Sequence, residues 1–464
     1  MTPQRQFQGL CIAASITFAG CATYPQQSVA PQIELPNTWN AAATIEGAPE
    51  AWLKDLNSPD LEVLIEEALV NNPNLQRTAA QFDQSIAEAR IAGADQLPSA
   101  GLGLNGTRQK ISTFGPSNTG GVRFDNYDLA LNLSWELDLW GQLRDRSSAA
   151  LAQVEASEAE LRGARLSLAA NVAKSWFNYI EAQEQLYLSQ KTAEADQANL
   201  QTIEQRFKRG LSEGLELRQM RTQTAFADAD ITTRRRALDQ ATRSLEVLIG
   251  RYPKSELITK STLPPLPKNI PAGLPADLLS RRPDLIAAER RLAAAEKELN
   301  ASRKDRLPKI SLTTSAGTSS QEFNNLLDSD FSAWKLGANL TQPIFQGGRI
   351  NANIDRSQAI LEQSIAQYRS TALQAFLEVE TTLAAERFLQ DQQRQLLIAE
   401  QEAAEAEALA WQRYREGTAD FVNVLNSQRS AASARSRLIA LRNLLLQNRI
   451  DLYLALGGPF ENAS

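Results

Sequence analysis

The sequence lacks histidine entirely and contains only two cysteines among its 464 residues. Histidine is the side chain most often used for general acid–base catalysis and the commonest metal ligand, so its absence disfavours catalytic triads and zinc sites. The cysteines, Cys11 and Cys21, lie near the N-terminus and are too few for a disulfide framework or a thiolate metal cluster. No pairing of a nucleophile with a base is visible elsewhere. We therefore expect a protein that is not an enzyme and uses neither a metal nor a cofactor.

Long hydrophobic runs are missing as well. After the N-terminus no stretch reaches the roughly 18 apolar residues that suggest a transmembrane helix, so any element that crosses a membrane would have to be a β-strand. The net charge of −6 is spread along the chain without a long basic run, which argues against nucleic acid as a partner.

The N-terminus has the pattern of a secretory leader. Arg5 supplies a positive charge, and residues 10–18 form an apolar core that is too short to span a membrane. We predict that residues 1–20 are a signal peptide.

Residues 18–21 read Phe-Ala-Gly-Cys and resemble the lipobox of bacterial lipoproteins, although Phe18 replaces the usual leucine. The resemblance implies that Cys21 becomes the first mature residue and carries diacylglycerol and an N-acyl chain such as palmitate. Ala22, in place of aspartate, implies sorting to the outer membrane, where several acyl chains give stable anchoring. The alternative is an ordinary leader that is cleaved elsewhere. Residues 21–60, with their dispersed prolines, are predicted to be an extended, lipid-anchored segment.

The body of the chain contains an internal duplication. The corresponding segments are residues 71–75 (Asn-Asn-Pro-Asn-Leu) and 281–285 (Arg-Arg-Pro-Asp-Leu), 96–98 and 306–308, 206–210 (Arg-Phe-Lys-Arg-Gly) and 413–417 (Arg-Tyr-Arg-Glu-Gly), and 248–250 and 455–457. The four pairs keep nearly one register, with shifts of 207 to 210 residues. We predict a first repeat at residues 61–252, a Pro-rich linker at 253–275, a second repeat at 276–458 and a tail at 459–464.

Each repeat is predicted to contain one β-hairpin. Apolar and polar residues alternate along residues 127–139 and again along 334–341, and a weaker strand precedes each of these segments. We place the hairpins at residues 99–139 and 309–345. Aromatic side chains near the strand ends suit membrane interfaces; they are Tyr127, Trp140, Trp334 and Phe345.

Helices flank each predicted hairpin. Residues 61–94 and 276–306 have helical apolar spacing and stop near a Leu-Pro pair. After the hairpins, residues 141–209 and 347–415 continue as helices of roughly 100 Å each, which no compact domain needs. Such lengths suit a coiled coil or a tube across the periplasm.

Each long helix is predicted to end at a glycine, Gly210 or Gly417, and to reverse into a second helix of about forty residues. Apolar residues in the second long helix recur closer to an eleven-residue than a seven-residue period, which keeps packed helices nearly straight.

Four strands cannot close a barrel, and an open sheet edge in lipid would leave backbone groups unpaired at several kcal/mol each. Three copies, with four strands each, would give a barrel of twelve strands, which is wide enough to begin to leave a channel. The strand pattern therefore favours a homotrimer.

The order of elements, present twice, resembles the TolC family of outer-membrane ducts over essentially the whole mature chain. Three features resemble its lipoprotein branch, the outer-membrane factors of resistance-nodulation-division efflux systems. They are the lipobox, the N-terminal stretch with dispersed prolines that ends at Trp39, and the segment 342–349 (Gln-Pro-Ile-Phe-Gln-Gly-Gly-Arg). The resemblance implies a mainly α fold with a transmembrane β-hairpin pair, assembled as a trimeric 12-stranded β-barrel that continues as a long α-helical periplasmic barrel.

The function implied by this resemblance is the outer-membrane channel of a tripartite efflux pump. Such a channel conducts drugs or other small toxic compounds passively. The implied partners are two further copies of the chain, outer-membrane lipid, a periplasmic adaptor of the membrane fusion protein kind, and an inner-membrane resistance-nodulation-division pump. The implied location is the outer membrane, with a lipid anchor and an extension into the periplasm.

The resemblance also assigns roles to the two helix reversals, which would form a periplasmic tip. The implied gate residues are Leu215, Gln219, Val422, Asn426 and Arg429, and the implied adaptor contacts are Gly210, Leu211, Ser212, Gly417, Thr418 and Ala419. Asn426 stands where the family has an aspartate, so we expect a gate held by van der Waals contacts and amide hydrogen bonds. The alternatives are ordinary coiled-coil packing for the gate residues and simple turn formation for the tips.

Two other functions remain open from the sequence. A duct for type I protein secretion would share the fold, and its usual lack of a lipid anchor makes Cys21 the feature that discriminates. A periplasmic coiled-coil tether without a pore would not need two alternating segments of membrane length.

Overall fold

The computed structural model describes residues 39–41, 52–56, 58–111, 121–257, 259, 261–266, 275 and 278–458. Cys21, the predicted signal peptide at 1–20 and the tail at 459–464 lie outside these residues, so lipid anchoring stays a prediction.

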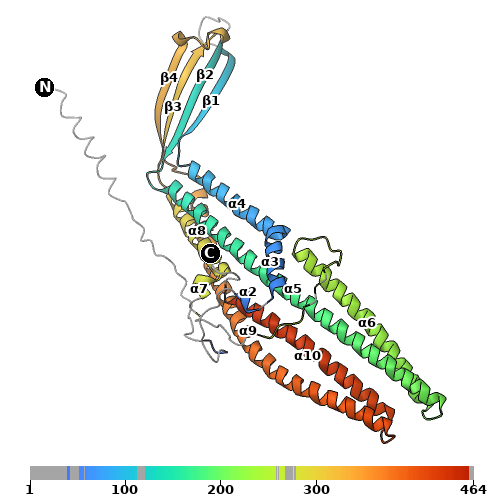
Figure 1. The fold of residues 1–464 in the computed structure, drawn as a ribbon. Coiled ribbons are helices and arrows are strands. Elements are labelled where there is room, and N and C mark those ends of the chain that lie inside the picture. The colour runs from blue at the N-terminus through green and yellow to red at the C-terminus, as the bar shows by residue number, and fades with distance from the viewer. Residues whose placement is uncertain are drawn as a thin grey trace, which may run out of the picture. The chain divides into compact units, whose positions relative to one another are not determined.

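The described chain forms helices α2 (Trp52–Asp55), α3 (Pro59–Asn71), α4 (Pro73–Ala94), α5 (Gln142–Lys208), α6 (Gly214–Leu248), α7 (Leu278–Arg281), α8 (Pro283–Lys304), α9 (Arg349–Arg415) and α10 (Phe421–Ala455), and strands β1 (Ser99–Ile111), β2 (Val122–Leu137), β3 (Lys309–Ser320) and β4 (Ser332–Thr341). Figure 1 shows the strands side by side and the two long helical hairpins, α5–α6 and α9–α10, running alongside each other. The fold is mainly α with one small sheet, which confirms the predicted class. None of the described helices has both the length and the apolar character needed to cross a membrane.

The two β-hairpins join into one antiparallel sheet in the order β1-β2-β3-β4. Pairing between β2 and β3 connects the repeats, with Leu133 opposite Thr314. Within the described residues β1 and β4 each pair on one side only, so the sheet of one chain has two open edges.

Both hairpins end slightly earlier than predicted. The second was placed at residues 309–345, but β4 stops at Thr341 because Pro343 has no N–H to donate to a ladder. The first was placed at residues 99–139, but β2 stops at Leu137. The next residue, Asp138, instead accepts hydrogen bonds from the backbone N–H groups of Leu143 and Arg144, at 3.1 and 2.9 Å, at the start of α5.

Prolines divide the helices that precede the hairpins. Residues 61–94 and 276–306 were each predicted as one helical stretch, but both are broken one residue before a proline, at Asn72 and Arg282. Both residues have extended backbone, because the proline ring disfavours helix in the residue before it. Each proline then occupies the first turn of the next helix, where a missing N–H costs nothing.

The predicted extended segment at residues 21–60 is also partly wrong. Its end contains the short helix α2 and the start of α3. The fully buried Trp52 of α2 stacks on Tyr453 of α10 with ring centroids 5.7 Å apart. Burial of this large side chain stabilises structure that the local sequence, rich in polar residues and proline, does not predict.

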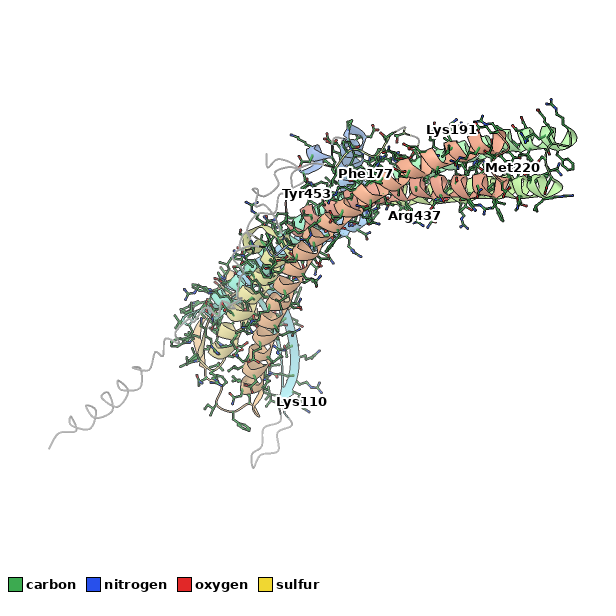
Figure 2. The ribbon with its side chains drawn as sticks, turned by 90° about the horizontal axis from the view of Figure 1, so that it is seen from below. Lys110, Phe177, Lys191, Met220, Arg437 and Tyr453 are labelled. Carbon is green, nitrogen blue, oxygen red and sulfur yellow. The ribbon has the colours of Figure 1, made fainter. Side chains whose placement is uncertain are left out.

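The long helices confirm the internal duplication. α5 and α9 contain 67 residues each, and α6 and α10 contain 35 residues each. The main hydrophobic core lies where α5 and α10 meet α2, α3 and α6, and includes Trp176, Phe177 and Ile180 of α5 and Ile450 and Tyr453 of α10. Figure 2 shows Phe177 and Tyr453 in this region.

In the first repeat the structure brings two of the duplicated landmarks into contact. Gly250, just after α6, has a positive φ of 83° and lies directly against Asn71. The amide of Asn72 donates a hydrogen bond of 2.8 Å to the carbonyl of Leu248, while its oxygen caps α4. The repeated sequence segments therefore mark one packed joint between α3 and α6.

The second repeat makes the same joint with different chemistry. Gly457 has a positive φ of 65° and lies against Arg281 and Arg282. The guanidinium group of Arg282 donates a hydrogen bond of 2.8 Å to the carbonyl of Ala455, which corresponds to Leu248. A buried arginine thus replaces the asparagine amide, and the geometry of the joint is kept.

The N-terminal segment is held on α9. Trp39 is buried, and its ring centroid lies 6.2 Å from that of Phe376. The backbone N–H groups of Asn40 and Ala41 donate hydrogen bonds of 2.8 and 3.0 Å to the carboxylate of Glu380. These contacts fix the point at which the chain enters the helical body.

Candidate functional site

The two helix reversals have the same backbone structure. Gly210 and Gly417 have φ values of 73° and 74°, in the left-handed region that glycine adopts without steric cost. Their N–H groups donate to the carbonyls of Phe207 and Tyr414, and the next residues, Leu211 and Thr418, donate to the carbonyls of Arg206 and Arg413. This pattern is the Schellman motif, which terminates a helix and satisfies its last carbonyl groups.

The glycines are needed for conformation rather than for space. A Cβ atom added at Gly210 or Gly417 would meet nothing within 4 Å. The turns are therefore exposed ends of the two helical hairpins.

A small apolar core joins the two tips within one chain. It contains Ile203 of α5, Leu217 and Met220 of α6, Tyr414 of α9, and Phe421, Val424 and Leu425 of α10. Trp411 contacts both Tyr414 and Phe421, with ring centroids 6.0 and 6.3 Å apart. Figure 2 labels Met220 in this part of the hairpins. The tips of the two hairpins therefore pack on each other.

A polar contact across this core was not predicted from the sequence. The hydroxyl of Tyr414 donates a hydrogen bond of 2.9 Å to the carboxylate of Glu216, which also accepts from the hydroxyl of Ser212. The guanidinium carbon of Arg206 lies 5.1 Å from the centre of the Tyr414 ring. Burial, together with the hydrogen bond to Glu216, raises the pKa of Tyr414, so its hydroxyl remains a donor. One hint of this contact is visible in the sequence: the second repeat has Tyr414, with a hydroxyl group, where the first repeat has Phe207.

The predicted gate residues lie beside this core rather than in it. Leu215 and Val422 are apolar and are 62% and 47% exposed in the single chain. Asn426 is exposed and Gln219 is half-buried. The exposed Arg429 donates a hydrogen bond of 3.2 Å from Nε to the side-chain oxygen of Gln223 on α6. The side chains of Leu215 and Val422 are therefore largely uncovered within one chain. Their position in a constriction of the trimer stays a prediction.

The predicted adaptor contacts lie at the outer end of the tips. Leu211 is 62% exposed, Gly210, Gly417 and Thr418 are exposed, and Ser212 and Ala419 are half-buried. The Thr418 hydroxyl donates to the carbonyl of Arg413 at 3.1 Å. Both turns are therefore accessible, while their polar groups are partly used to hold the turn.

No group of three or more Asp, Glu or Cys side chains suited to holding a metal ion is found within the described ranges. A cavity of about 890 Å³ is lined mainly by α4, α5, α8 and α9 and contains Arg282 and Arg291, each already paired with a carboxylate.

The described sheet has two open edges and continues into two helices of roughly 100 Å, each of which reverses at an exposed tip into a shorter helix. This arrangement defines the class of the protein: one subunit of an outer-membrane duct. The chain belongs to the Outer membrane efflux protein family, whose match covers residues 64–251 and 274–458.

Relatives agree with this family over nearly the whole chain. The toluene efflux pump outer membrane protein TtgF of Pseudomonas putida is 32% identical over 98% of this chain and 97% of its own length. The cation efflux system protein CusC of Escherichia coli is 31% identical over 97% of this chain and 98% of its own length.

A solved structure agrees as well. The outer-membrane channel OprN is similar in fold, with a TM-score of 0.86 and 26% identity, over 93% of this chain and 99% of that chain. The prediction of an outer-membrane efflux component is therefore confirmed.

Proposed function

We propose that the protein is the lipid-anchored outer-membrane duct of a tripartite efflux pump and that it works as a homotrimer. The observation that carries the proposal is the pair of open sheet edges, β1 and β4, on a chain whose helical hairpins end in two exposed tips. In this assembly the strands line an exit through the outer membrane. The tips meet a periplasmic adaptor, which connects them to an inner-membrane resistance-nodulation-division pump.

The open edges of the sheet support the proposed homotrimer. β1 presents 13 residues and β4 presents 10 residues of backbone that pair on one side only among the described residues. In lipid each unpaired group costs several kcal/mol, so β1 of one copy must pair with β4 of the next until the ring closes. Three copies give a barrel of twelve strands that leaves room for a lumen. Large apolar side chains on the edge strands are exposed in one chain, among them Leu102 and Leu104 of β1 and Leu336 and Leu340 of β4.

The exported compound is best described by class. The relatives that match this chain at similar identity are named for toluene in one case and for cations in another. A passive duct needs no pocket shaped for one cargo, so we assign small toxic compounds and drugs as cargo and assign the selection among them to the pump.

The first experiment is single-channel recording of the purified protein in a planar bilayer, with the intact mass measured on the same sample. We expect a small, mostly closed conductance from particles of three chains. The mass should correspond to a chain that starts at Cys21 and carries diacylglycerol and an N-acyl chain. A water-soluble, unlipidated species without conductance would contradict the proposal and favour a periplasmic tether.

The gate is tested by Val422→Ser. Val422 is apolar, lies at the tip and is half exposed in one chain, as expected of a side chain that contacts its copies across a lumen. Loss of its apolar contact destabilises the closed state by about 1 kcal/mol per chain, or about 3 kcal/mol for three chains. The ratio of open to closed channels should therefore rise on the order of a hundredfold. We expect faster uptake of vancomycin-sized solutes by cells that express the variant.

Val247→Ser is the matched control for this experiment. Val247 is also an exposed valine, 55% accessible, but it lies at the far end of α6 from the tip. Uptake should stay at the wild-type level in this variant. Equal uptake in Val422→Ser and the wild type would argue against a gate at Val422.

A further inference from the structure

A carboxylate is buried between the two helical hairpins, above the tip core. Asp196 of α5 is only 1% exposed. It accepts hydrogen bonds from the side-chain amides of Gln223 on α6, at 3.2 Å, and Gln428 on α10, at 3.4 Å. Within the described residues no cationic nitrogen lies within 4 Å of it. Burial of a carboxylate that has only neutral donors is costly, so this side chain is unusual in a helix interface.

The charged groups that face Asp196 come from two other helices. Arg429 of α10 acts on it through space and is joined to it through Gln223, whose side-chain oxygen accepts from Arg429 at 3.2 Å. Glu407 of α9 carries a negative charge close enough for the two carboxylates to repel each other. Glu407 is held by Arg435 of α10 at 3.5 Å. The group that faces Asp196 from α6 is the neutral amide of Gln223. The charged groups that act on Asp196 are therefore the cation Arg429 and the anion Glu407.

Burial raises the pKa of Asp196, and the hydrogen bond from Gln223 and the charge of Arg429 act against this rise. Burial also raises the pKa of Glu407, and the charge of Arg435 acts against this rise while the charge of Asp196 adds to it. Asp196 therefore binds a proton more tightly when α10 covers it than when the hairpins separate and expose it to water, and Glu407 is coupled to it through the charge of Asp196. By linkage, the packed arrangement becomes more stable as the pH falls and less stable as it rises through these raised values.

We propose that Asp196 and Glu407 form a proton-operated latch between the α5–α6 and α9–α10 hairpins. When the two groups are protonated, the hairpins stay packed and the tips stay closed. When they ionise, the buried charge and the mutual repulsion favour separation of the hairpins. This inference rests on the proposed duct, because it assigns a proton as a second input to the opening of the tips. A duct built in this way opens less readily in acid surroundings.

The test compares the open probability of single channels at about pH 7.5 and about pH 5 for the full-length trimer in planar bilayers. For the wild type we expect the open probability to fall on acidification, by up to about tenfold for each unit by which the pKa of the packed state exceeds that of the open state. Asp196→Asn keeps the shape of the side chain and removes the charge. This variant should have a low open probability at both pH values, and Glu407→Gln should show a smaller pH effect than the wild type.

The matched control is Asp230→Asn, which removes a half-exposed carboxylate on α6 that pairs with Arg234. It should retain the wild-type pH dependence. Wild-type pH dependence in Asp196→Asn, or opening of the wild type in acid, would overturn the latch. If Asp196→Asn does not assemble, loss of the pH effect in Glu407→Gln supports the latch and full retention overturns it. A channel with pH-independent gating refutes the latch alone, whereas absence of any conductance refutes the duct.

Discussion

Replacement of Arg449 by methionine is expected to lower the free energy of unfolding by about 3–5 kcal/mol. Arg449 of α10 and Glu386 of α9 are both fully buried, and their side chains meet at 2.8 Å. Glu386 also accepts hydrogen bonds from the amides of Asn448 and Gln390, at 3.1 and 3.0 Å. Loss of the guanidinium group would leave the carboxylate buried with neutral donors only. Denaturant unfolding of the detergent-solubilised protein, followed by far-ultraviolet circular dichroism, measures the loss.

Two further variants show whether the buried charge is the cause. Glu386→Gln combined with Arg449→Met removes both charges, so it should recover most of the stability lost in the single variant. Arg394→Met breaks an exposed pair with Asp391 on α9 and should cost at most about 1 kcal/mol. A similar loss in Arg394→Met and Arg449→Met would show that burial of the pair has no special effect.

Replacement of Gly250 by alanine should cost about 2–5 kcal/mol. The positive φ of 83° costs about 1–2 kcal/mol for a residue with a Cβ atom. In addition, the new Cβ would lie 2.6 Å from the carbonyl oxygen of Asn71 and 2.8 Å from its Cβ, and such overpacking costs about 1–3 kcal/mol. The same unfolding measurement applies, with the yield of assembled trimer as a second readout.

Gly210→Ala separates the two contributions. Gly210 has nearly the same φ, 73°, but a Cβ added there meets no atom within 4 Å. It should therefore show only the conformational cost, about 1–2 kcal/mol. Equal losses at Gly210 and Gly250 would mean that the close approach of Asn71 contributes nothing to the joint.

Much of the fold could be predicted because its signals are local. A period of two along β2, the Leu-Pro pair after each predicted helix, the glycine at each reversal and the repetition of these features act within a few residues of the chain. The ends of the elements were less accurate. β2 stops before Asp138 because that side chain caps α5, and a cap depends on where the next helix begins.

The candidate site was predicted only in part, because some of its contacts join residues that lie far apart in the sequence. The two reversals at Gly210 and Gly417 could be placed because glycine and the repeat mark them. Glu216 was missed, because its role depends on Tyr414, which lies 198 residues away in the sequence. Asp196 was missed because one aspartate among the polar residues of a long helix looks solvated until α10 covers it.

Local patterning thus accounts for the order of the strands and long helices, their duplication and the class of the protein, since periodicity and turn residues act along the chain. The packing of distant helices accounts for the rest: the joint at Gly250 and Asn71, the buried pair of Glu386 and Arg449, and the carboxyl group of Asp196. The physical reason is that burial, more than residue type, sets the energy of a charged or crowded group, and burial is known only when separate helices are in contact.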